Sequence, residues 1–222
     1  MAGKGELHFF CGKMAAGKST LARKITAVVQ GVLLPEDHWL SELYPDEIQD
    51  FDDYILYSRR LKSLLKTHVQ GLLKAGVNVV LDFPGNTIRQ RAWFKTVFVE
   101  EGFSHTLHFL DVPDELCLQQ LAKRSKGLPE GTAFTTPEEF RLVTSYFEAP
   151  TEKEGFSVQE HKPHLKVLRG YTEDALPQGT LGLAIAFAHA LDNEEYEVAL
   201  QYLSDVTVYH APSEIRIVAE SI

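Results

Sequence analysis

A glycine-rich segment near the start of the chain has the residue types that bind phosphate. The nine residues from Gly12 to Thr20 read G-K-M-A-A-G-K-S-T and match the pattern G-x-x-x-x-G-K-[ST] in full. Glycines let the backbone curl so that successive N–H groups point at phosphate oxygens, and the N-terminus of the following helix adds partial positive charge. In such a loop the Lys18 ammonium reaches the β- and γ-phosphates, and the Ser19 hydroxyl is a ligand of Mg²⁺. The motif predicts a site for ATP with Mg²⁺, formed by Gly12, Lys13, Met14, Ala15, Ala16, Gly17, Lys18, Ser19 and Thr20.

Two aspartates follow apolar runs that are typical of buried strands. Asp37 lies in P-E-D-H-W after a short apolar run, and Asp82 ends the run V-N-V-V-L-D. In a doubly wound sheet, residues just past the carboxyl ends of the strands line the ligand crevice. Asp37 could there accept a proton from an acceptor hydroxyl during phosphoryl transfer, and Asp82 could hold Mg²⁺ or its water. Each also has an ordinary structural interpretation, as a helix cap for Asp37 and as a strand-end turn for Asp82.

Basic residues occur at two further places that a nucleotide site could use. Arg124 lies in L-A-K-R-S-K-G-L-P-E-G-T, where a helix enters a loop that contains glycine. A mobile basic segment of this kind can close over the nucleotide and bring an arginine to the transferring phosphate, although the helix dipole alone also favours a basic C-terminus. Arg89 and Arg91 begin a helix just after Asp82, where they oppose the helix dipole. We therefore expect them to have a role near the same crevice.

Aromatic and histidine residues give weaker indications. The aromatics between residues 39 and 57 could cap a substrate or simply pack a small helical insertion, and we favour packing; they are Trp39, Tyr44, Phe51, Tyr54 and Tyr57. Two histidine pairs lack the spacing and partners of a metal site, so we expect them to be structural or solvated; they are His105 with His108 and His161 with His164.

Strands and helices alternate over the first three quarters of the chain, which predicts a parallel sheet flanked by helices. Apolar runs indicate strands at Leu7–Cys11, Val32–Leu34, Val77–Leu81, Thr106–Leu110 and Leu165–Leu168. Helical periodicity follows Lys18 and continues at Tyr54–Ala75, Thr87–Glu101, Pro113–Lys126 and Pro137–Phe147.

After Gly170 the pattern changes. Residues 173–180 indicate a linker, and Leu181–Asp205 predicts two helices, with short candidate strands at Thr207–Tyr209 and Ile215–Val218. Too few strands follow to close a core of their own. We therefore predict an α/β domain at residues 1–170 and a linker with a helical tail at residues 171–222.

Composition excludes several classes of protein. The chain has 222 residues and a net charge of −9, which disfavours a protein that binds nucleic acid mainly by neutralising phosphates. Its two cysteines, Cys11 and Cys117, lie in separate apolar stretches, as expected in a reducing cytoplasm. The first apolar run is too short for a signal peptide, and no stretch is long enough to span a membrane. These features predict a cytoplasmic protein without a membrane anchor and leave the oligomeric state open.

Four segments together resemble a known family. They are G-K-M-A-A-G-K-S-T, P-E-D, V-V-L-D-F-P-G-N-T-I-R-Q-R-A-W-F and L-D-V-P-D-E-L-C-L-Q-Q-L-A-K-R. In combination they resemble the bacterial AAA-domain family of predicted kinases, which is related to zeta toxins, chloramphenicol phosphotransferase and polynucleotide kinase. The resemblance covers about Glu6 to Arg169. It implies a three-layer P-loop NTPase sandwich, with a five-stranded parallel sheet in the order 2-3-1-4-5 and a helical lid.

The resemblance also implies roles for individual residues. Lys18 and Ser19 match the nucleotide and Mg²⁺ residues, and Asp82 matches the acid after the third strand. Asp37 matches the acid that orients or deprotonates the acceptor hydroxyl in related kinases, and Arg124 matches the lid arginine. These matches imply a kinase in which Lys18, Asp37 and Arg124 are catalytic and Ser19 and Asp82 hold the metal.

One departure from the family pattern bears on the acceptor. Zeta toxins and polynucleotide kinase have D-x-x-R at the position where this chain has D-H-W-L, from Asp37 to Leu40. The missing arginine argues against a nucleic-acid end or a nucleotide sugar as acceptor. We therefore expect ATP-dependent transfer to a hydroxyl of a small molecule, whose identity the sequence does not reveal. The alternative is an ATP-binding or ATP-hydrolysing switch that acts through a partner protein.

The tail resembles a second family. The segment A-F-A-H-A-L-D-N-E-E-Y-E-V-A-L-Q-Y-L-S-D-V-T-V-Y-H-A-P is similar to the opening helices and first strand of a SnoaL-like domain. Such domains are much longer than the tail, so the resemblance implies a truncated or decayed fusion, with the tail packed on the kinase or poorly ordered.

Overall fold

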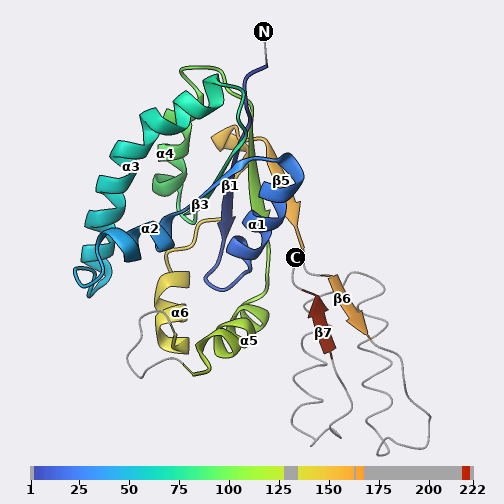
Figure 1. The fold of residues 1–222 in the computed structure, drawn as a ribbon. Coiled ribbons are helices and arrows are strands. Elements are labelled where there is room, and N and C mark those ends of the chain that lie inside the picture. Colours follow the sequence, from blue (N-terminus) through green and yellow to red (C-terminus); the bar gives the residue numbers. More distant parts are fainter. Residues whose placement is uncertain (1–2, 128–134, 163, 168–216, 221–222) are drawn as a thin grey trace, which may run out of the picture. The chain divides into compact units, whose positions relative to one another are not determined.

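The computed structural model describes residues 3–127, 135–162, 164–167 and 217–220 (Figure 1). The chain divides into a unit of residues 1–162 and a second unit of residues 163–221. The expected linker, the two tail helices and the SnoaL-like segment lie outside the described residues. Among the described residues, no helix combines the length and the apolar character needed to cross a bilayer.

The first unit is built on a five-stranded parallel sheet. Its strands are β1 (Leu7–Gly12), β2 (Val32–Pro35), β3 (Val79–Pro84), β4 (His105–Leu110) and β5 (Val158–His161). They lie in the order β2-β3-β1-β4-β5, which confirms the predicted sheet. Because the neighbouring strands β1, β2 and β3 are parallel, their carboxyl ends lie at the same edge of the sheet.

The fifth strand differs from the sequence-based expectation. The sheet ends with β5, whereas the expected strand at Leu165–Leu168 overlaps β6 (His164–Val167). That strand pairs antiparallel with β7 (Ile217–Glu220) in a separate two-stranded sheet in the second unit. The physical reason is that β5, with the sequence V-Q-E-H, is a largely exposed edge strand. Backbone pairing with β4 defines it, so it has no apolar run that sequence analysis could detect.

Helices cover both faces of the sheet. In the first unit they are α1 (Lys18–Val29), α2 (Glu36–Leu43), α3 (Phe51–Lys74), α4 (Ile88–Phe98), α5 (Asp114–Ser125) and α6 (Pro137–Thr144), followed by the single-turn helix η1 (Glu152–Glu154). The helices α3 and α4 pack side by side on one face, and α1 packs against β1, β2 and β3 on the other (Figure 1). This arrangement is the predicted three-layer sandwich.

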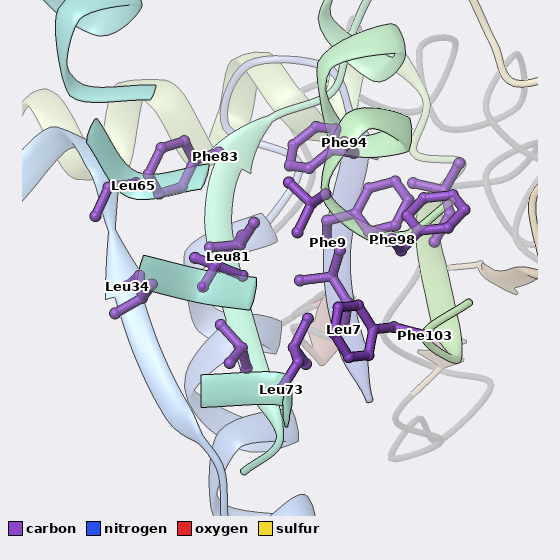
Figure 2. Close-up of a cluster of buried hydrophobic side chains, with 14 of the residues drawn as sticks. Leu7, Phe9, Leu34, Leu65, Leu73, Leu81, Phe83, Phe94, Phe98 and Phe103 are labelled. Atoms are coloured by element: carbon purple, nitrogen blue, oxygen red, sulfur yellow. The ribbon is translucent and has the colours of Figure 1, made fainter. Parts of the chain in front are cut away.

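The main core lies between the sheet and the pair α3–α4 (Figure 2). Because side chains alternate along a strand, β1 directs Leu7, Phe9 and Cys11 into this layer. The Phe9 and Phe94 rings stack with centroids 4.4 Å apart. Each fully buried side chain of this size contributes about 1.5–3 kcal/mol to folding. The core thereby fixes β1, and with it the start of the phosphate-binding loop.

Candidate active site

The loop between β1 and α1 has the backbone geometry that its glycines predict. Gly17 has a φ of 96°, in the left-handed region that disfavours side chains. Gly12 instead is needed for space, because a Cβ there would lie 3.0 Å from Leu110 Cβ and 3.2 Å from the Leu110 carbonyl oxygen. The backbone of this loop therefore requires both glycines of the motif, Gly12 for space and Gly17 for its positive φ.

The loop offers positive charge in a form suited to phosphate. The first turn of α1 contains no acidic residue and Gly17 provides no side-chain cap, so no side chain of the helix itself compensates the partial positive charge of its N-terminus. The Lys18 Nζ atom lies across the loop and donates to the carbonyl oxygens of Gly12 at 2.6 Å and Lys13 at 2.8 Å. Burial lowers the pKa of Lys18, and the negative charges of Asp82 and Asp37 act in the opposite direction.

The two predicted aspartates come together at the carboxyl edge of the sheet. Asp82 lies in β3 beside Pro35 of β2, and Asp37 follows in the first turn of α2. Burial raises the pKa of Asp82, whereas a hydrogen bond with the Ser19 side chain and the charge of Lys18 lower it. The structure thus places the Ser19 hydroxyl against the Asp82 carboxylate, the pair expected to hold Mg²⁺.

Asp37 interacts electrostatically with the other residues of this edge. The residue is exposed, but protein atoms surround much of its carboxyl group, so burial raises its pKa. The negative charges of Glu36 and Asp82 raise this pKa further, and the positive charges of Lys18 and Arg124 lower it. The carboxyl group therefore lies within electrostatic reach of the phosphate-binding loop, of β3 and of the end of α5.

Helix α5 contacts the phosphate-binding loop through its N-terminus. Lys13 forms an ion pair with Asp114, the first residue of α5. Arg124 lies exposed in the last turn of the same helix. Most of the expected lid, residues 128–134, lies outside the described residues.

The carboxyl edge of the sheet offers few protein ligands for a metal ion. Within the residues that the structure describes, no group of three or more histidines, cysteines or acids could hold a metal ion. Ser19 and Asp82 together supply only oxygen ligands and leave most of a coordination shell open. This donor set fits Mg²⁺, which is usually bound by one or two protein oxygens together with phosphates and water.

The comparison with known families decides the classification. The AAA domain family matches residues 7–150. The chain belongs to this family. No curated protein matches the sequence.

Solved structures, among them two kinases, share the fold of this AAA domain. A sugar kinase from Janibacter has 17% identity and a TM-score of 0.51, over 72% of this chain and 85% of that chain. The APS kinase of Mycobacterium tuberculosis, solved with AMPPNP and APS, has 16% identity and a TM-score of 0.51, over 94% and 99% of the two chains. Kti12 from Chaetomium thermophilum, solved with ADP-AlF3, has 13% identity and a TM-score of 0.51, over 70% and 88%. At these identities the likeness establishes the fold.

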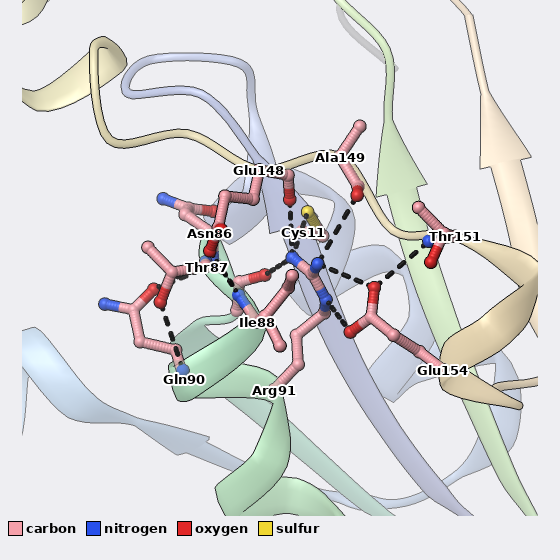
Figure 3. A network of polar contacts seen from close by, with 11 residues as sticks. Cys11, Asn86, Thr87, Ile88, Gln90, Arg91, Glu148, Ala149, Thr151 and Glu154 are labelled. Carbon is pink, nitrogen blue, oxygen red and sulfur yellow. Dashed lines mark hydrogen bonds and ion pairs between the residues drawn. The ribbon is translucent and has the colours of Figure 1, made fainter.

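Arg91 of the AAA domain lies in the interior and not in the crevice where we expected it (Figure 3). Its guanidinium is fully buried and forms two hydrogen bonds of 2.8 Å to the Glu154 carboxylate. It also donates to the carbonyl oxygens of Gly85 at 3.0 Å and Glu148 at 2.7 Å. Arg91 is therefore a structural residue, and the expectation was wrong because its partners are distant in sequence. Arg89, two residues earlier, is exposed.

Asn86 is a residue of the AAA domain site that sequence analysis missed. Its Oδ1 atom accepts a hydrogen bond of 3.1 Å from the Gly12 backbone N–H, at the start of the phosphate-binding loop. Its backbone carbonyl accepts from Glu148 N at 2.9 Å (Figure 3). Asn86 lies in the family segment V-V-L-D-F-P-G-N-T-I-R-Q-R-A-W-F, just before the Thr87–Gln90 capping box that begins α4.

Four of the five aromatics pack against the core, as we favoured, whereas Phe51 is 49% exposed; the four are Trp39, Tyr44, Tyr54 and Tyr57. Tyr44 and Tyr57 stack with centroids 4.2 Å apart, and Tyr57 donates to Glu47 Oε2 at 2.6 Å. His105 stacks on Phe98 at 3.8 Å. The side chain of His164 lies outside the described residues.

Proposed function

We propose that the chain is an ATP-dependent phosphotransferase that moves the γ-phosphate of ATP to a hydroxyl of a small molecule. The observation that supports this proposal most strongly is the position of Asp37. Its carboxyl group lies near Lys18 and Asp82, so an acid able to take a proton stands beside a phosphate-binding loop. Simple nucleotide binding would not need an acid there. The shared fold with a sugar kinase and an APS kinase also supports phosphoryl transfer.

The proposed reaction assigns one task to each residue. The loop from Gly12 to Thr20 binds the phosphates through its N–H groups, and Lys18 exchanges its contacts with two carbonyl oxygens for phosphate oxygens. Ser19 and Asp82 hold Mg²⁺, which when bound neutralises charge on the β- and γ-phosphates. Arg124 contacts the transferring phosphate.

In this proposal Asp37 accepts the proton of the acceptor hydroxyl. The acceptor oxygen forms a bond to the γ-phosphorus, the bond from that phosphorus to the ADP oxygen breaks, and the hydroxyl proton moves to the Asp37 carboxylate. A raised pKa makes this carboxylate a better proton acceptor than an ordinary surface aspartate. The negative charge around it and the missing arginine after it favour a small acceptor over a nucleic acid. The two free, buried cysteines support a cytoplasmic setting.

The experiment that tests the proposal is ADP release from ATP with Mg²⁺, alone and with a panel of hydroxyl compounds. We expect one class of acceptor to stimulate release, and the Asp37→Asn variant to lose this stimulation while it still binds ATP. Asp46→Asn is the matched control, because Asp46 is an exposed acid between α2 and α3. Unchanged turnover in Asp37→Asn would contradict the assignment of Asp37. Tight ATP binding with slow turnover that no acceptor stimulates would instead favour a nucleotide-dependent switch.

A further inference from the structure

A buried carboxylate lies directly before the proposed catalytic acid. Glu36 is the first residue of α2 and its side chain is 0% exposed, whereas the next residue, Asp37, is exposed. Removing a carboxylate from water costs several kcal/mol unless partners replace the lost hydration. The position of Glu36 thus requires specific partners.

These partners come from one face of α3. The Tyr54 hydroxyl donates to Glu36 Oε2 at 2.9 Å, and the Ser58 hydroxyl donates to Oε1 at 2.7 Å. The Lys62 ammonium forms an ion pair with Oε1 at 3.2 Å. Because these three residues are spaced by four, they form a single stripe along the helix. Helix α3 therefore holds the first turn of α2 through the Glu36 carboxylate.

The charge of Glu36 acts on the proposed active site. Burial raises the pKa of Tyr54 well above its usual range, and the charges of Glu36 and Asp37 raise it further. The Tyr54 hydroxyl accordingly stays protonated as a donor, and it lies close enough to Asp37 to sense its charge. The groups that influence the pKa of Asp37 come from four elements: Glu36 on α2, Asp82 on β3, Lys18 on α1 and Arg124 on α5.

Fold stability alone does not account for a buried ion pair, because well-packed apolar residues often stabilise a core as much as an ion pair does, or more. Apolar side chains would join α2 to α3 as well, but they would place no charge beside Asp37. What the Glu36 carboxylate adds beyond packing is a negative charge that raises the pKa of Asp37.

We propose that Glu36 is a positioning residue of the phosphotransfer site: by binding Tyr54, Ser58 and Lys62, it fixes the first turn of α2 and holds the Asp37 carboxylate in place relative to Lys18. Glu36 acts only through Asp37 and does not touch the substrate. This inference rests on the proposed function. A displacement of about 1 Å at a reacting group can cost on the order of 100-fold in rate, so the anchoring of α2 has a large effect on turnover.

The decisive variant is Glu36→Gln, which keeps the side-chain shape and an oxygen acceptor but removes the charge. We expect the pKa of Asp37 to fall, because a neighbouring negative charge that raised it is gone. NMR titration of the aspartate carboxyl carbons measures this directly, with Asp37→Asn to assign the signal, and it needs no acceptor. In turnover assays the acid limb of the pH profile should move to lower pH. The kcat should fall roughly 10- to 100-fold, with KM for ATP within about threefold.

Glu47→Gln is the matched control. Glu47 also accepts a hydrogen bond from a tyrosine of α3, Tyr57, but it is exposed, and the acids that raise the pKa of Asp37 are Glu36 and Asp82. We expect it to leave both the Asp37 titration and the kcat unchanged. A second pair, Tyr54→Phe and Tyr57→Phe, tests the anchor without removing the Glu36 charge. Tyr54→Phe should lower kcat without lowering the pKa of Asp37, and Tyr57→Phe should do neither.

The outcomes separate the two proposals. A folded, ATP-binding Glu36→Gln protein with an unchanged Asp37 titration and unchanged kcat would overturn the role of Glu36. If Glu36→Gln does not fold, equal kcat values for Tyr54→Phe and Tyr57→Phe would overturn it. A lowered Asp37 pKa in a protein that no acceptor stimulates would support the action of Glu36 on Asp37 and contradict the phosphotransferase.

Discussion

Two lysines of the phosphate-binding loop have different surroundings. Within the described residues, the Lys18 ammonium donates to two backbone carbonyl oxygens, and phosphate oxygens can replace these uncharged acceptors. The Lys13 ammonium is instead paired with the Asp114 carboxylate. At the scale of single residues, the partner of each side chain therefore indicates which lysine is available to the nucleotide.

We predict that Lys18→Ala lowers kcat/KM for ATP by at least about 100-fold, as expected for the loss of a charge that stabilises the transition state. Lys13→Ala should have a much smaller effect, because the Lys13 ammonium is already paired with the Asp114 carboxylate and alanine keeps the backbone N–H of the loop. ADP release and ATP titration of both variants test this. Equal losses would show that the Lys13 side chain also contacts the nucleotide.

The raised pKa of Asp37 predicts a pH dependence of activity. The carboxylate form accepts the proton, so kcat/KM should fall as the pH drops through the pKa of Asp37. Because burial and the charges of Glu36 and Asp82 raise this pKa, the fall should begin at a higher pH than for an ordinary aspartate. A pH profile of acceptor-stimulated ADP release measures the acid limb. A limb in the usual range of a solvated carboxyl would contradict the placement of Asp37.

At the scale of elements, Arg91 joins several segments that are far apart in sequence. It connects the end of β3, the start of α4 and the chain between α6 and β5 (Figure 3). Asn86 adds a contact from the same turn to the phosphate-binding loop. The geometry of the loop thus depends on elements outside the motif itself.

We predict that Arg91→Lys destabilises the protein by about 1–3 kcal/mol, because a lysine ammonium cannot form the paired hydrogen bonds to Glu154 together with the bonds to buried carbonyl oxygens. Denaturant unfolding measures the loss. Arg89→Lys is the matched control, since Arg89 lies exposed on the same helix and should change stability by less than about 0.5 kcal/mol. Similar stabilities of the two variants would refute the structural role of Arg91.

Three histidines form a hydrogen-bonded chain across β1, β4 and β5. His8 Nδ1 lies 3.2 Å from His108 Nε2, and His108 Nδ1 lies 3.0 Å from His161 Nε2. Burial lowers the pKa of all three; with the nearby charges of His161 and His8, it lowers that of His108 to about 3. The charge of Glu6 opposes the shift at His8. The three imidazole rings in the sheet are therefore neutral.

The hydrogen-bonded chain of three histidines predicts that the folded protein loses stability in acid. An unfolded histidine has a pKa of about 6.5, so below that pH the unfolded state binds more protons than the folded state. The stabilisation is complete above about pH 6.5 and decreases as the pH falls toward the folded pKa, by about 1.4 kcal/mol per pH unit for one proton. Denaturant unfolding from pH 7 to 5 should show a weaker dependence in His108→Gln than in the wild type. The exposed His68→Gln serves as control, and an unchanged slope in His108→Gln would contradict the prediction.

At the scale of the whole molecule, every residue of the proposed site belongs to the first unit. The five strands of the parallel sheet all end before residue 163, where the second unit begins. Nucleotide binding should therefore need only the first unit.

We predict that a chain ending at Lys162 binds ATP with the affinity of the full chain, within about threefold, because the anion site consists of a loop and a helix N-terminus inside that unit. Isothermal titration of both forms with ATP and Mg²⁺ tests this. A shortened chain that folds but binds ATP much more weakly than the full chain would contradict the prediction.

The amino-acid sequence by itself determined the features that depend on neighbouring residues. The loop from Gly12 to Thr20, the strands β1 to β4 and the positions of Asp37 and Asp82 at strand ends all follow from local patterns. These patterns have a period of two along strands and 3.6 along helices. With the family resemblance, they also predicted the strand order of the sheet.

Only the tertiary structure decided which side chains meet. It placed Glu36 in the interior against α3, paired Arg91 with Glu154 and made V-Q-E-H the fifth strand in place of Leu165–Leu168. Glu36 and Arg91 are charged residues whose burial depends on partners up to 63 residues away, and β5 is defined by its backbone pairing with β4. No local pattern encodes such contacts, because the cost of burying a charge is offset only where distant segments pack together.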